Sequence, residues 1–179
     1  MPDTESAPTG ARRATPDMEA LFKLLKTFIN LCLLRANPQD LPAAPVLTVG
    51  ALLAYMLVSV GLSAPDLGLG RAASWAVLDT LVLAILTHSA LLIRRFPERL
   101  YQTLTALMGS SALLGLAAWP LINSQNTVLQ IVLLLWNLAV VAHILRHALS
   151  VPLALGFIVS FGYFTLELMV SLPFMPATG

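Results

Sequence analysis

No Asp, Glu, Lys or Arg interrupts residues 100–145, LYQTLTALMGSSALLGLAAWPLINSQNTVLQIVLLLWNLAVVAHIL. An uncharged polar turn at residues 123–127 divides this stretch into two apolar runs. Each run approaches the roughly 20 residues that a helix needs to cross the hydrocarbon core of a bilayer. Lipid offers the backbone no hydrogen-bond partner, so the runs must be helical. The stretch therefore predicts two antiparallel membrane-spanning helices joined by a short turn.

The composition extends this interpretation to the whole chain. Of 179 residues, 58% are hydrophobic and 11% are charged, and the mean hydropathy is +0.82. A soluble domain carries about 25% charged residues, so this surface is predicted to face lipid. The net charge of +1 gives no basic field for nucleic acid, which we exclude as a partner. The single cysteine, Cys32, excludes an intrachain disulfide and a cysteine metal cluster, and we expect no metal or cofactor.

The pattern along the chain predicts an all-α, polytopic transmembrane bundle. Residues 1–17 are polar and lack the apolar core of a signal peptide, which predicts a disordered cytoplasmic tail. Residues 18–35 have apolar side chains at helical spacing, with Lys23 and Lys26 opposite them. This predicts an amphipathic helix in the membrane interface, and a helix docked on the bundle is the alternative. A five-helix transmembrane domain at residues 45–172 follows, with spans at about 45–64, 73–93, 101–122, 128–145 and 151–172.

Two connections receive specific predictions. Residues 64–72 should form a loop between the first two spans. Ser150 and Pro152 are expected to serve as the N-cap and an early helical proline of the last span.

The basic residues predict the orientation. Nine of the ten Lys and Arg residues precede the first span or fall in the links after the second and fourth spans, and only Arg71 falls on the other side. The positive-inside rule then places the N-terminus and residues 94–99 in the cytoplasm and the C-terminus outside. We expect a multi-pass protein of the bacterial inner membrane, with a periplasmic C-terminus.

Asp79 is the first candidate functional residue, because it lies within the second span. An ionised carboxylate there costs several kcal/mol unless it is paired, hydrated or protonated. Ala76, Thr80, Leu83 and Thr87 lie on or beside its helix face, which is predicted to turn inward. A carboxyl group that neighbouring helices satisfy, or that stays wet near the interface, is the structural alternative.

Glu167 is the second candidate and the only charge of the last span. Gly156, Ser160, Tyr163 and Glu167 form a small and polar stripe, in which Tyr163 is expected to donate to Glu167 one turn away. The predicted topology puts Asp79 and Glu167 at similar depth, in the outer half of the membrane. Two carboxylates brought together would share a proton or bind a cation, although the sequence does not show that the two helices touch.

Other polar residues extend the candidate set. Gln130 and Asn137 share one face of the fourth span and are expected to form interhelical hydrogen bonds. His143 and His147 are spaced i, i+4 but lack the Glu of a zinc-binding H-E-x-x-H motif, and Arg146 would oppose a cation, so a hydrated interfacial cluster is expected. Basic residues that are candidates for lipid headgroup contacts, or that only determine topology, are Lys23, Lys26, Arg94, Arg95 and Arg99.

The organisation of residues 18–172 resembles that of Yip1-type membrane proteins: a cytoplasmic N-terminal region, five closely spaced spans and a short outer C-terminus. Gly162-Tyr163 within a span is the only local likeness, and the Asp-Leu-Tyr-Gly-Pro type motif of eukaryotic members is absent. The Ala- and Leu-rich spans and the Pro38-to-Pro42 corner are more similar to small uncharacterised bacterial inner-membrane proteins. The resemblance implies partner binding or membrane organisation, and it transfers no functional residue.

The chain contains no G-x-S-x-G, no glycine-rich phosphate loop and no paired cysteines, so we expect no enzymatic activity. The first functional hypothesis is a membrane protein that binds the bilayer and other membrane proteins, or a second copy of itself, in membrane organisation or assembly. The alternative is a small proton- or cation-coupled transporter that uses Asp79 and Glu167. A membrane enzyme acting on lipid through His143 and His147 ranks last.

Overall fold

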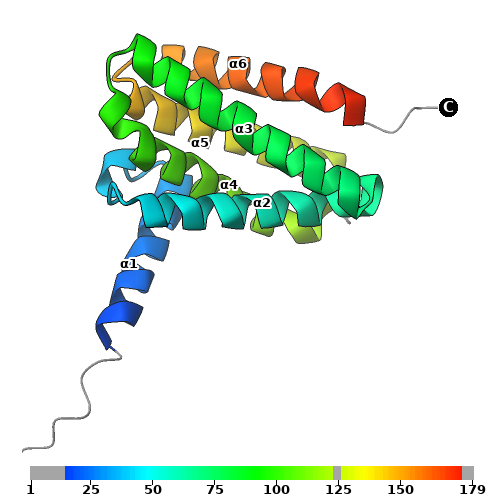
Figure 1. Cartoon of the computed structure of the whole chain (residues 1–179), viewed down its shortest axis with the longest axis horizontal. Helices are drawn as coiled ribbons and strands as arrows, with labels where there is room; N and C mark the ends of the chain where they lie inside the picture. The colour runs from blue at the N-terminus through cyan, green and yellow to red at the C-terminus, as the bar shows by residue number, and fades with distance from the viewer. Residues whose placement is uncertain (1–14, 123–125, 175–179) are drawn as a thin grey trace, which may run out of the picture.

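The structure, a computed structural model, describes residues 15–122 and 126–174, and these residues form helices and short links without a strand (Figure 1). The helices in chain order are α1 (Thr15–Cys32), α2 (Pro45–Leu67), α3 (Leu69–Ile93), α4 (Leu100–Ile122), α5 (Thr127–Ala148) and α6 (Leu153–Ser171). Three 3₁₀ turns separate or extend them: η1 (Pro38–Asp40), η2 (Pro97–Arg99) and η3 (Leu172–Phe174).

The helices α2 to α6 are each long and apolar enough to cross a membrane. They confirm the predicted all-α, polytopic bundle with five spans, and each predicted span overlaps one of them. Figure 1 shows these five helices running side by side. They close into a ring in which α2 packs on α3 and α4, α4 on α5, α5 on α6, and α6 on α3.

The predicted loop at residues 64–72 is wrong, because only Gly68 separates α2 from α3. Its N–H donates to the carbonyl of Ala64, and its own carbonyl accepts from the N–H of Ala72. Gly68 has φ +76° and ψ 155°, a conformation that is open almost exclusively to glycine. One glycine therefore ends the first span, reverses the chain and starts the second.

The predicted N-cap role of Ser150 is also wrong. Ser150 has φ +53° and follows the end of α5, where the N–H of Val151 donates to the carbonyl of Arg146. This pattern closes a helix C-terminus. Ser150 Oγ accepts a hydrogen bond from Arg99, and α6 begins at Leu153 after Pro152 as N-cap.

The N-terminal helix α1 leaves the bundle near one end and runs across the direction of the other helices (Figure 1). Its last turns pack on α4 and α5, where Trp136 Nε1 donates to the carbonyl of Cys32 at 3.0 Å. It ends before the predicted residue 35, because Leu34 adopts φ +61° and the N–H of Arg35 donates to the carbonyl of Asn30, which caps the helix C-terminus. Of the predicted tail, residues 1–14 lie outside the described residues, and residues 15–17 begin α1.

We call the end of the bundle that holds Arg94, Arg95, Arg99 and Arg146 the basic end. The half of the ring next to it is tightly packed. Fully buried side chains fill this half, among them Leu91, Leu107, Val140, Ile144 and Leu145. The half away from the basic end contains the cavity described below.

Candidate functional site

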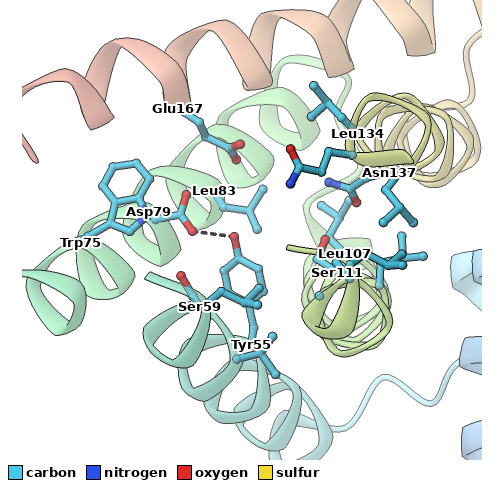
Figure 2. Close-up of a pocket in the computed structure, with 18 residues that line it drawn as sticks. Tyr55, Ser59, Trp75, Asp79, Leu83, Leu107, Ser111, Leu134, Asn137 and Glu167 are labelled. Carbon is cyan, nitrogen blue, oxygen red and sulfur yellow. Dashed lines mark hydrogen bonds between the residues drawn. The ribbon is translucent and has the colours of Figure 1, made fainter. Parts of the chain in front are cut away.

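A cavity of about 420 Å³ lies between the five spans, and all five contribute to its wall. We call it the carboxylate cavity, because both intramembrane carboxylates line it (Figure 2). Its polar lining residues are Tyr55, Ser59, Trp75, Asp79, Ser111, Gln130, Asn137 and Glu167. No Lys, Arg or His belongs to the lining among the described residues. The cavity therefore collects polar and acidic groups without an opposing positive charge.

Asp79 reaches the cavity from α3 and is 5% exposed. The predicted inward face of this helix is confirmed, since Ala76, Thr80, Leu83 and Thr87 are buried beside it. The hydroxyl of Tyr55, on α2, donates to Asp79 Oδ2 at 2.5 Å (Figure 2). One carboxylate oxygen is thus fixed by a neighbouring span. Sequence reasoning missed Tyr55, and the available signal was a hydroxyl-bearing ring within an otherwise apolar span.

Glu167 enters the same cavity from α6, which packs against α3. Figure 2 shows its carboxylate and that of Asp79 pointing into one shared space. The two helices therefore touch, and both acidic side chains line one cavity. The similar depth predicted from the topology accounts for this arrangement.

A small chamber of about 40 Å³ adjoins the carboxylate cavity, and we call it the side chamber. Glu167 and Asn137 line both spaces, and Tyr163 lines only the side chamber. A polar space of this size can hold a water molecule. Glu167 thus stands between a large cavity and a small polar chamber.

Two predicted hydrogen-bonding roles around the side chamber are wrong. Tyr163 was expected to donate to Glu167, but its buried hydroxyl lies beside that of Thr87, and it makes no hydrogen bond to Glu167 among the described residues. Asn137 was expected to bridge helices, but its buried Oδ1 has no partner among the described residues. The predicted shared face of Gln130 and Asn137 agrees with the structure, since both line the carboxylate cavity.

The carboxylate cavity extends toward the end of the bundle opposite the basic end. Gln130, in the first turn of α5, is exposed, and Trp75 lies in the second turn of α3. Toward the basic end, the wall is closed by Tyr55, Leu83 and the buried Leu107. The lining near the basic end therefore includes buried side chains, whereas the lining far from it includes an exposed residue.

The remaining predicted residues lie at or near the basic end. Arg94 Nε donates to the carbonyl of Leu149 at 3.2 Å, and Arg99 Nη1 donates to that of Ala148 at 3.1 Å. Both arginines therefore satisfy carbonyls at the end of α5 that would otherwise lack partners. Three other predicted headgroup contacts are exposed: Lys23, Lys26 and Arg95.

The two histidine rings of α5 pack edge to face, with their centroids 4.7 Å apart, and each ring also has a polar partner. His143 Nε2 lies 3.0 Å from the carbonyl of Ala36, and His147 Nε2 accepts from Arg146 Nε at 3.1 Å. The described residues contain no group of three His, Cys, Asp or Glu side chains that could hold a metal ion.

No protein-family model, curated protein or solved structure matches this chain. The fold and site define its class by themselves. It is a polytopic α-helical membrane protein with two carboxylates in a cavity between its spans.

Proposed function

We propose that the protein binds a proton or a small cation between Asp79 and Glu167 and couples this binding to transport across the membrane. The observation that carries the proposal is the presence of both carboxylates in one cavity of about 420 Å³ that has no basic lining residue. Intramembrane carboxylates typically mark ion pathways and proton relays.

The chemistry of the cavity supports a cationic ligand. Two nearby carboxylates in a poorly hydrated space resist full ionisation, so they share a proton or bind another cation. Tyr55 donates to one oxygen of Asp79, which leaves lone pairs of both carboxyl groups for a ligand. The amide oxygen of Asn137 is a further acceptor.

The position of Glu167 supports coupling. Its side chain borders the carboxylate cavity and the side chamber, so a proton on Glu167 has acceptors or water positions on two sides. With the basic end in the cytoplasm, as the positive-inside rule predicts, the carboxylate cavity faces the outside. The proposed site then takes its cation from the periplasmic face of a bacterial inner membrane.

Proton uptake into proteoliposomes tests the proposal. The purified chain is reconstituted with an internal pH-sensitive dye, and a potassium diffusion potential, negative inside, drives protons inward. Asp79→Asn and Glu167→Gln are each expected to lower uptake to the rate of empty liposomes. Asp66→Asn is the matched control, because Asp66 is an exposed carboxylate at the end of α2 that does not line the cavity.

Equal uptake by the wild type and by the Asp79→Asn, Glu167→Gln double variant would eliminate the mechanism. Wild-type liposomes that take up neither protons nor, in parallel assays, Na⁺ or K⁺ would also contradict it. Circular dichroism and a monodisperse elution profile confirm that each variant folds.

A second candidate is the binding of partner membrane proteins or lipids, which the sequence alone ranked first. The observation that favours it is the exposure of large apolar side chains on α1, where Leu21 and Phe22 are each 66% exposed. Leu21→Ser with Phe22→Ser is expected to reduce co-purification of lipid or protein in mild detergent. Unchanged co-purification would argue against this role for α1.

A further inference from the structure

A second polar hollow, of about 470 Å³, lies at the basic end and is separate from the carboxylate cavity. We call it the arginine pocket. Its lining residues are Gln39, Arg99, Arg146, His147, Ser150, Val151, Pro152 and Leu153. Two of them carry a permanent positive charge, and no lining residue is acidic. The pocket is thus suited to a negatively charged group.

The two guanidinium groups are held in place by the surrounding fold. Arg99 lies over the ring of Phe96 at 4.2 Å, and its Nη1 also donates to Ser150 Oγ at 2.9 Å. Arg146 is fixed through Nε, which donates to His147. Among the described residues, these hydrogen bonds use one nitrogen of each guanidinium. The other N–H groups remain as donors, because a guanidinium carries five of them.

The end of α5 does not cancel this positive charge. The negative end of the helix dipole points here, and the nearby carbonyls accept from side chains: His147 O from Gln39 at 3.1 Å, and Leu149 O from Arg94. The acidic side chain of Asp40 lies close to His147 without lining the pocket. The balance in and around the pocket remains positive.

One wall of the arginine pocket is apolar. Val151, Pro152 and Leu153 form the link into α6, and Leu153 is 43% exposed at the start of this span. A ligand in the pocket would therefore place its charge against the arginines and any hydrocarbon against the outer surface of α6.

We propose that the arginine pocket binds the phosphate group of an anionic lipid headgroup. Guanidinium groups match phosphate oxygens with paired, charge-assisted hydrogen bonds, and Ser150 lies in the same wall as a neutral polar group. The apolar wall favours a lipid over free phosphate, although the two share the recognised group. The site is independent of the proposed transport, because it lies at the opposite end of the ring and uses different residues.

Thermal unfolding in neutral detergent tests the proposal with three added ligands: phosphatidic acid, phosphatidylcholine and inorganic phosphate. Phosphatidic acid is expected to raise the unfolding midpoint more than phosphatidylcholine does. Arg146→Gln is expected to weaken the apparent affinity for phosphatidic acid about tenfold or more, the effect of losing a charged hydrogen-bond donor. Arg35→Gln is the matched control, since it removes an equal charge from an exposed side chain outside the pocket.

The outcomes separate the possible ligands. If only inorganic phosphate stabilises the protein, and Arg146→Gln abolishes this effect, then the pocket binds phosphate but its ligand is not a lipid. Equal weakening by Arg146→Gln and Arg35→Gln would overturn the site, because general attraction to positive charge then explains binding. The absence of a midpoint shift with both phosphatidic acid and inorganic phosphate would overturn the site as well. Arg146→Lys keeps the positive charge but lacks the planar guanidinium group, so it is expected to bind phosphatidic acid with intermediate affinity. This variant tests the site even if Arg146→Gln folds poorly.

Discussion

Replacing Gly156 with alanine is expected to force α5 and α6 apart. A Cβ atom at this position would lie 2.7 Å from the carbonyl oxygen of Ala142 and 3.0 Å from Cβ of Arg146. Ordinary contact begins near 3.4 Å, so the two helices must separate by about 0.7 Å. A backbone oxygen cannot rotate away as a side chain can. The separation therefore has to come from the packing of whole helices.

The expected loss in the free energy of unfolding is about 1–2 kcal/mol. Overpacking costs roughly 1–3 kcal/mol, and a single added methyl group falls in the lower part of this range, at about 1–2 kcal/mol. The hydrogen bond from Ser160 Oγ to the carbonyl of Leu138, 3.0 Å long, lies one turn away and would weaken, with a cost of about 0.6 kcal/mol for such bonds in membranes. The better helix propensity of alanine returns about 0.5–1 kcal/mol. The net change lowers the equilibrium ratio of folded to unfolded protein roughly 5- to 30-fold.

Reversible unfolding by SDS in mixed micelles, followed by circular dichroism, measures this change. Gly162→Ala is the matched control, because position 162 lies on the same helix with nothing within 4 Å of a Cβ atom. It is expected to be neutral or slightly stabilising. If Gly156→Ala is as stable as Gly162→Ala, then the close approach of α5 and α6 is not what requires glycine, and the reasoning fails.

Three further predictions concern other parts of the molecule. Gly68→Ala is expected to cost about 1–3 kcal/mol through its φ of +76° alone, and Gly70→Ala, where no left-handed backbone is required, should cost less in the same SDS titration. Burial raises the pKa of the Cys32 thiol from 9.0 to about 11, so the reactive thiolate is about 100-fold scarcer. Maleimide labelling of Cys32 should therefore be at least 100-fold slower in the folded protein than in SDS. Equal labelling rates would contradict this prediction. Tyr55→Phe is expected to lower stability by about 1 kcal/mol by leaving Asp79 without its donor, and an unchanged SDS midpoint would show that the bond contributes nothing.

The membrane fold could be predicted because hydropathy and charge act along the chain. Lipid requires long apolar helices, and the five predicted spans rest on this requirement. The inward face of α3 was also predictable, since Asp79 and Thr80 repeat with Ala76 and Leu83 at helical spacing. In both cases, the residues on which the prediction rests are neighbours in the sequence or lie on one helix.

Details that depend on contacts between helices were not predictable. The bond from Tyr55 to Asp79 depends on how far α2 and α3 slide past each other, which Gly68 sets by linking them without a loop. Ser150 resembles an N-cap in sequence, but Arg99 from the η2 turn donates to its hydroxyl, and its positive φ belongs to the C-terminal end of α5. Tertiary contacts therefore override the local signal at these positions.

The unpartnered polar atoms of the ring are all on one side of it. Among the described residues, buried side-chain atoms without a hydrogen bond occur on Thr87, Asn137 and Tyr163, which belong to α3, α5 and α6. On the α2–α4 side, by contrast, the buried hydroxyls of Thr48 and Thr105 bond to each other at 2.8 Å. An unsatisfied buried polar group costs about 1–3 kcal/mol, and an apolar side chain of similar size would avoid the cost. Asn137 and Tyr163 line the side chamber together with Glu167, so a water molecule in this chamber would have polar partners on two helices and would remove part of that cost.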